Sequence, residues 1–275
     1  NAPVPLPDTK KGQVYRRELE KLQDELEKQK LEILETSANL NPNLPEEAEQ
    51  LDDLRAKLEQ IEEVTIDIEK QLAANETTFT DYEQLEWLQQ RLIESWNTKE
   101  VRGRVVYFHH PPYVTEATKW HQAQTLAVRQ RLRGVLNGVS KAVGKQAEGL
   151  PLVDLFLFGH AHCLEYLRTE DTGGADSHLN WIVCGGSGHS LRRQRTEGPE
   201  LTETLGNGEG QRMITVARSH LFIGRHGQGL QKHRPYSCLR IDVFDGRPPK
   251  FIVRPFVTEL SQRQWNNREI EPFTI

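Results

Sequence analysis

What the 275-residue chain lacks excludes several classes of protein. It has only three cysteines, an odd number, so neither a disulfide framework nor a cysteine-ligated zinc site is expected. This cysteine usage favours a reducing compartment such as the cytoplasm. The longest apolar runs, such as residues 152–158, are far shorter than the roughly 20 residues of a membrane-spanning helix. No membrane span is therefore expected.

The chain also lacks an excess of positive charge. It carries 35 Lys and Arg against 40 Asp and Glu, a net charge of -5. Affinity for nucleic acid depends mainly on clustered cations, so nucleic-acid binding is not indicated. Residues 1–7 have neither an initiator Met nor the layout of a signal peptide, and we expect the chain to begin inside a longer protein.

Residues 12–75 are the most acidic part of the chain, with 17 Asp and Glu against 8 Lys and Arg. Apolar residues recur there with heptad spacing in two runs, separated by a segment rich in Pro and Asn at 39–45. The pattern predicts an antiparallel coiled-coil hairpin after an extended lead-in at 1–11. The hairpin is interpreted as a protruding or dimerisation arm, with a dedicated binding surface for a protein partner as the alternative.

The chain after residue 75 has the pattern of a layered α/β protein. Residues 80–83 read as a capping box with Thr80 as the cap, and a second helix is expected from about 118 to 136. Short apolar runs and turn residues predict strands at 105–108, 153–158, 181–184, 213–217, 237–244 and 251–256. The polar stretch from Arg192 to Arg212 is expected to be a mobile loop.

The first chemically informative motif is His109-His110-Pro111-Pro112, directly after a predicted strand. Residues before proline are driven toward extended conformations, so the imidazoles are held at a strand tip. Neutral imidazole is a good ligand for Zn, Fe and Mn. By itself the motif fits a metal site or a pair of surface histidines.

The second motif is Gly159-His160-Ala161-His162, which also follows a predicted buried strand. In an extended segment residues i and i+2 share a face, so both imidazoles are expected to point at one cavity and ligate neighbouring ions. The alternative is a pair of polar loop residues.

Together the two motifs resemble those of the calcineurin-like metallophosphoesterase family, which includes purple acid phosphatases. The resemblance covers roughly residues 78–253, including Gln84 to Leu88 and the strand that runs into the Gly-rich turn at 181–188. It implies that residues 76–275 are the C-terminal half of an α/β/β/α sandwich. Residues 12–75 would then be an insertion.

The resemblance also implies a site with two metal ions, Mn, Fe or Zn, about 3.5 to 4 Å apart. His109 and His160 would ligate one ion and His162 the other, with His110 beside the site. The implied activity is phosphoester hydrolysis by a metal-bound hydroxide, as a phosphatase or phosphodiesterase. His189 and Arg192 are weaker candidates for contact with the substrate phosphate, with a basic surface loop as the alternative.

Three further motifs of the family, Asp-x-His, Gly-Asp-x-x-Asp and Gly-Asn-His, are not in place in this sequence. Asp176-Ser177-His178 spells the first of them, but it lies in a Gly-rich turn after the second histidine motif and is interpreted as coincidence. We therefore expect an N-terminal segment or fragment of the same protein to supply the Asp, Asn and His ligands. The alternative is a catalytically inactive scaffold that binds a partner through the helical hairpin.

Overall fold

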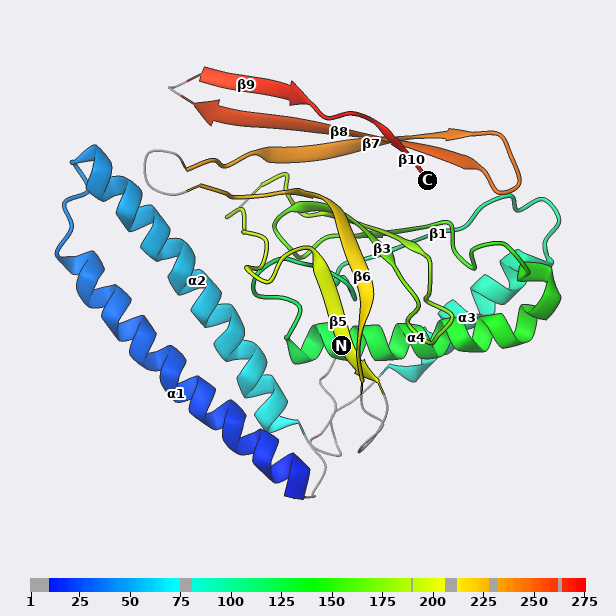
Figure 1. Ribbon diagram of the computed structural model, residues 1–275, viewed down its shortest axis with the longest axis horizontal. Coiled ribbons are helices and arrows are strands. Elements are labelled where there is room, and N and C mark those ends of the chain that lie inside the picture. Colours follow the sequence, from blue (N-terminus) through cyan, green and yellow to red (C-terminus); the bar gives the residue numbers. More distant parts are fainter. Residues whose placement is uncertain (1–9, 75–80, 189, 206–211, 228–231, 262–263) are drawn as a thin grey trace. The chain divides into compact units, whose positions relative to one another are not determined.

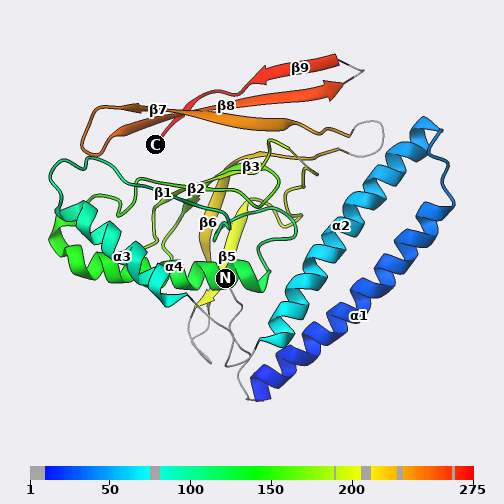
Figure 2. The ribbon, with the colours of Figure 1, turned by 180° about the vertical axis from the view of Figure 1, so that it is seen from behind.

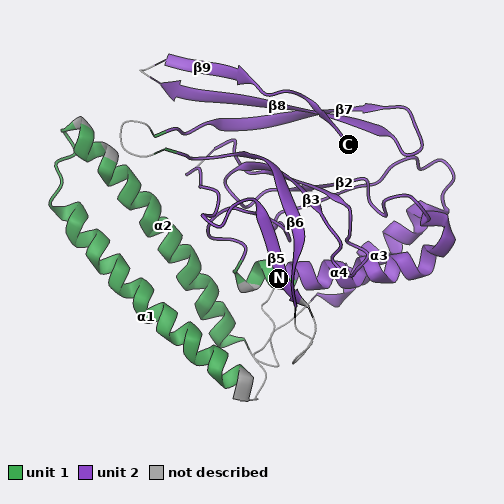
Figure 3. Ribbon diagram, viewed as in Figure 1, with its two compact units in different colours: residues 1–80, 121–127, 227–232 green, residues 81–120, 128–226, 233–275 purple. Residues whose placement is uncertain are grey.

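The computed structural model describes residues 10–74, 81–188, 190–205, 212–227, 232–261 and 264–275. The chain divides into two compact units (Figure 3). The first consists of residues 1–80, 121–127 and 227–232, and the second of residues 81–120, 128–226 and 233–275. The predicted boundary between residues 75 and 76 thus lies close to the first division of the chain.

Two helices of 29 residues each, α1 (Lys10–Ala38) and α2 (Pro45–Ala73), dominate the first unit (Figure 1). Leu26, Ile61 and Ile68 form the small core between them. Arg16 near the start of α1 donates to the carbonyl of Leu72 near the end of α2 at 3.2 Å, so the helices run in opposite directions. Because α1 already begins at Lys10, the extended lead-in expected over residues 1–11 is wrong for its last two residues.

The second unit begins with helix α3 (Tyr82–Asn97). Its N-cap is Asp81, whose side chain accepts from the backbone N–H of Gln84 at 2.9 Å. The expected cap at Thr80, which lies outside the described residues, is therefore wrong by one position, because the Asp81 carboxylate satisfies the free N–H group. Helix α4 (Ala123–Val143) begins and ends later than expected and continues into a short 3-10 turn, Gly144–Ala147.

A six-stranded mixed sheet forms the centre of this unit, in the order β1-β2-β4-β3-β6-β5. β1, β2 and β4 are parallel, and β3, β6 and β5 continue the sheet antiparallel. Their bounds are β1 (Val105–Phe108), β2 (Leu155–Phe158), β3 (Leu164–Thr169), β4 (Asn180–Cys184), β5 (Glu200–Leu205) and β6 (Arg212–Ile223).

Strand β5 lies inside the stretch that was expected to be a mobile loop, so that expectation is wrong for residues 200–205. Leu201 is completely buried in the main core, and β5 pairs along its length with β6. Pairing with a neighbouring strand outweighs the polar composition from which the loop was predicted.

The second sheet consists of β7 (Tyr236–Phe244), β8 (Lys250–Ser261), β9 (Gln264–Glu269) and β10 (Phe273–Thr274). Its strand order is β10-β8-β7, and β9 pairs with β8 as well. All of these pairings are antiparallel.

The helices and the two sheets of the second unit are stacked in layers (Figures 1 and 2), and alternating side chains of the central strands pack toward opposite layers. Phe156, Phe158 and Trp181 belong to the core shared with α3 and α4. Leu155 and Ile182 point the other way and pack against Phe251 and other residues of the second sheet. This alternation gives a helical layer, a sheet and a second sheet, and it confirms the mixed α/β class. None of the helices in the described ranges is long and apolar enough to cross a membrane.

Candidate metal centre

The two histidine motifs follow neighbouring strands of the six-stranded sheet. β1 and β2 pair in parallel with Phe108 opposite Phe158, so both chains leave the sheet at the same edge. The contact continues past the strands, because the N–H of Gly159 donates to the carbonyl of His109 at 3.1 Å. Carboxyl ends of parallel strands are where α/β proteins assemble binding residues. Two motifs far apart in the sequence therefore meet at one place.

The second motif turns sharply at its first histidine. His160 has a φ of 62°, a left-handed conformation that is uncommon for residues other than Gly, and the N–H of Ala161 donates to the carbonyl of Gly159 at 2.8 Å. The extended backbone expected from His160 to His162 is therefore wrong. Backbone strain of this kind concentrates at functional sites. As a result, His160 lies beside His109 and His110, whereas His162 lies beside Ser190.

His109, His110 and His160 form a compact group. The ring centroids of His109 and His160 lie 5.2 Å apart, and those of His110 and His160 lie 4.4 Å apart. One possible ligand nitrogen from each ring lies within 4.8 Å of the other two. Two nitrogens bound to one tetrahedral zinc ion lie about 3.4 Å apart, so a bound ion would require the three rings to move closer together. Imidazole donors suit Zn, Fe or Mn, and no carboxylate joins the group among the described residues.

His162 and Arg192, the other predicted site residues that the structure describes, do not belong to this group. The Nδ1 atom of His162 is 3.1 Å from the carbonyl oxygen of Ser190. Arg192 is buried, with 5% of its surface exposed, and its backbone N–H donates to the carbonyl of His162 at 3.0 Å. His189 lies outside the described residues. The structure thus brings His109, His110 and His160 together, and leaves His162 outside the group with Arg192 bound to its carbonyl.

Lys119 is a contact of the site that the sequence did not suggest. Its Nζ atom lies 3.1 Å from Nε2 of His160, and the residue is only 1% exposed. Burial, and then the positive charge of Lys119, lower the pKa of His160 to about 3. Burial, and then the charge of Arg192, lower the pKa of Lys119 to about 7. His160 is therefore neutral at physiological pH, the state in which imidazole binds metal ions.

Two buried carboxylates, Glu116 and Glu165, lie near Cys163, the residue after His162, and were also missed by the sequence analysis. Glu165 accepts from the N–H of Thr115 at 3.0 Å and from its hydroxyl group. Burial raises the pKa of Glu165 to about 7 and that of Glu116 to about 7. The one sequence signal was a glutamate inside an apolar strand, where an unpartnered carboxylate is unexpected.

Comparison with known proteins adds no family assignment. No family model matches the chain, and no curated protein matches it. The function must therefore be argued from the geometry of the site itself.

Proposed function

We propose that this chain is part of a metal-dependent phosphoester hydrolase of the calcineurin-like metallophosphoesterase type. The observation that carries the proposal is the group of His109, His110 and His160, assembled from two histidine motifs at the ends of adjacent parallel strands. A helical layer, a sheet and a second sheet behind this edge are compatible with that fold. The proposed ligands are His109 and His160 for one ion and His162 for a second.

A bound Mn, Fe or Zn ion would supply Lewis-acid activation of the phosphoester and of a water molecule. Residues of this chain make the electrostatic potential around the histidines favourable for an anionic substrate. Arg192 is a cation whose charge acts on Lys119, and Lys119, with a pKa of about 7, carries part of a positive charge next to His160 at neutral pH. A positive local field raises the concentration of anions such as phosphoesters.

The same proposal requires further ligands, because a two-metal site needs bridging and terminal oxygen donors beyond three imidazoles. We propose that an N-terminal segment of the same protein, outside residues 1–275, supplies Asp, Asn and His. β1 is the end strand of the six-stranded sheet, and Tyr107 on it is 80% exposed. Among the described strands β1 pairs only with β2, so its outer edge is suited to accept a further strand.

Hydrolysis of an aryl phosphate by the full-length protein, loaded in turn with Mn, Fe and Zn, tests the proposal. We expect metal-dependent activity that falls more than about 100-fold in His109→Ala and in His160→Ala, because loss of a ligand exceeds the usual effect of losing an outer contact. His220→Ala is the matched control, since His220 is an exposed histidine on β6. Activity that survives both ligand substitutions contradicts the proposal.

A second candidate is a metallophosphatase-like scaffold without catalysis that binds a partner through α1 and α2. It is favoured by the absence of a carboxylate from the histidine group in the described part of the chain. Elemental analysis of the full-length protein separates the two candidates. Well under one metal ion per chain supports the scaffold, whereas one or two ions per chain, lost together with His109 and His160, support the hydrolase.

A further inference from the structure

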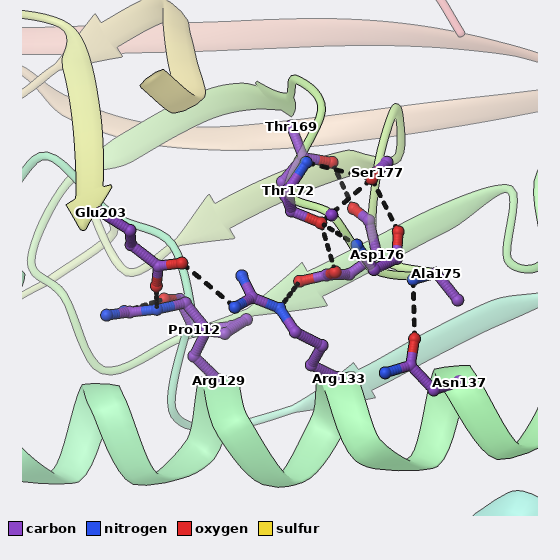
Figure 4. Close-up of polar contacts among 12 residues, drawn as sticks. Pro112, Arg129, Arg133, Asn137, Thr169, Thr172, Ala175, Asp176, Ser177 and Glu203 are labelled. Atoms are coloured by element: carbon purple, nitrogen blue, oxygen red, sulfur yellow. Dashed lines mark hydrogen bonds and ion pairs between the residues drawn. The ribbon is translucent and has the colours of Figure 1, made fainter. Parts of the chain in front are cut away.

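The loop that carries His109 and His110 has few ways to hold its own shape. Pro111 and Pro112 follow directly, and proline has no backbone N–H to donate. The loop must therefore be fixed through its carbonyl groups or by side chains from elsewhere in the fold. Helix α4 supplies these contacts through two arginines one turn apart, Arg129 and Arg133 (Figure 4).

Arg129 holds the loop at Pro112. Its NH1 group donates to the Pro112 carbonyl at 3.0 Å, while its Nε group donates to the carboxylate of Glu203 on β5. The guanidinium also lies over the ring of Trp120, 3.9 Å from the centroid. With only 5% of its surface exposed, Arg129 has its direction fixed by three separate contacts.

Arg133 holds the next residue of the loop, Tyr113. Its NH2 group donates to the Tyr113 hydroxyl at 2.8 Å and its Nε group to Asp176 at 2.8 Å. The Tyr113 hydroxyl donates in turn to Asp176. Arg133 also donates to Glu203 at 3.1 Å, so this carboxylate joins the two arginines (Figure 4). The network therefore connects α4, β5 and the 169–179 turn to one short loop.

Stability alone gives no reason for so many buried charges. A buried ion pair seldom stabilises a protein more than apolar residues of the same volume, because both charges lose their hydration. What such a network does provide is fixed direction, since each donor accepts only a narrow range of geometries. The contacts end on Pro112 and Tyr113, within a few residues of His109 and His110.

We propose that Arg129 is a positioning residue that keeps His109 and His110 next to His160, with Glu203 and Arg133 holding it in place. The metal-binding consequence rests on the proposed function, whereas the arrangement of the three imidazoles does not. Arg129 acts through the Pro112 carbonyl and touches neither substrate nor metal. Its planar fork is essential, because a lysine at this position keeps the charge but carries its donors on a single atom, without the flat group that spans Glu203 and Pro112 and lies over Trp120.

The test uses Arg129→Lys, with Arg218→Lys as the matched control. Arg218 forms an ion pair with Glu200 at 2.7 Å, and both side chains are exposed, unlike those of the buried network. In the metal-free protein, NMR is expected to show shifted ring signals for His109 and His110 in Arg129→Lys and unchanged signals in the control. The affinity for Co²⁺ or Zn²⁺ is expected to fall about 10-fold or more in Arg129→Lys only, with altered Co²⁺ absorption bands.

The outcomes separate this inference from the proposed function. Unchanged histidine signals and wild-type metal affinity in Arg129→Lys overturn the positioning role, even if the protein is a hydrolase. If the histidine signals shift in Arg129→Lys but the wild-type protein binds no metal, the positioning role is supported and the hydrolase is contradicted. If Arg129→Lys does not fold, Glu203→Gln is used instead, since it leaves Arg129 in the chain but removes the charge that orients the guanidinium toward Pro112. A folded Glu203→Gln protein with unchanged His109 and His110 signals overturns the proposal.

Discussion

The two histidine loops leave the same edge of one sheet, but different parts of the molecule hold them. The loop after β1 contains two prolines and is fixed by side chains of α4, above all by Arg129 at the Pro112 carbonyl. The loop after β2 is held by backbone contacts, through the left-handed turn at His160 and the close approach of Gly185, which follows β4, to Ala161. The first loop should therefore respond to the loss of distant charges, and the second to the addition of a single atom near its backbone.

Gly185→Ala is expected to have the largest effect, because it acts on the backbone contact of the second loop. A Cβ atom at Gly185 would lie 1.9 Å from the carbonyl oxygen of Ala161, and backbone cannot yield cheaply. We expect the free energy of unfolding to fall by at least about 3 kcal/mol, measured by urea denaturation. Gly188→Ala is the control, since nothing lies within 4 Å of its added Cβ, and equal losses in both variants would contradict the argument.

Glu165 connects the two loops, because it lies in β3 directly after the second loop and binds Thr115, which follows the first loop. The pH dependence of stability tests this connection. Burial raises the pKa of Glu165 from 4.5 to about 7, so the folded protein holds this proton more tightly than the unfolded chain does. Its contribution to stability is fully present below about pH 4.5 and is lost as the pH rises through about 7.

Between pH 5 and 8 the free energy of unfolding of the wild type should therefore fall relative to that of Glu165→Gln, by about 3 kcal/mol. Urea denaturation of both proteins across this range measures the difference. Glu116, whose pKa burial also raises to about 7, stays in both proteins, but the charge of Glu165 contributes to that rise, so the difference reports Glu165 together with its effect on Glu116. Parallel curves for the two proteins would show that Glu165 ionises freely in the folded state.

Glu203→Gln tests the first loop through its distant anchor. Glu203 is 15% exposed and accepts from both Arg129 and Arg133, so its neutralisation leaves Arg129 without a carboxylate and Arg133 with Asp176 alone. We expect a loss of about 2 kcal/mol in the free energy of unfolding. Glu200→Gln on the same strand removes an ion pair that is 45% exposed on its Glu200 side and should cost less than about 0.5 kcal/mol. Similar losses in the two variants would remove the distinction between the buried network and a surface pair.

The sequence predicted those parts of the fold that depend on local pattern. The strands at 105–108, 153–158 and 181–184 were located within two residues of β1, β2 and β4 because continuous apolar runs between turn residues mark them. β3 and β5 were missed, since Glu165 interrupts one run and Thr and Glu dominate the other. These strands form because neighbouring strands pair with them, which no local pattern encodes.

The same limit applies to the candidate site. Each histidine motif was visible because His, Pro and Gly stand next to one another in the sequence. Lys119 and Arg129 were not visible, because an isolated cation in a helical stretch looks like an ordinary surface residue until the fold buries it against His160 or Pro112. The position of His162 was also not predictable, since the extended backbone assumed for the motif fails at the left-handed His160.

Gly159→Ala is expected to have the smallest effect on stability and still to change the site, because it acts where the two loops meet. An added Cβ would lie 3.3 Å from Nδ1 of His109, so the imidazole must move by a few tenths of an ångström. His109 is exposed and can move, and we expect the free energy of unfolding to change by less than about 1 kcal/mol. The displaced Nδ1 of His109 would then be less well placed to bind the same ion as His110 and His160. The affinity for Zn²⁺, measured by competition with a chelating dye, should therefore fall about 3- to 10-fold. Gly188→Ala serves again as the control, and unchanged affinity in Gly159→Ala would mean that the first loop adapts freely, contrary to the fixed position that its buried anchor at Pro112 requires.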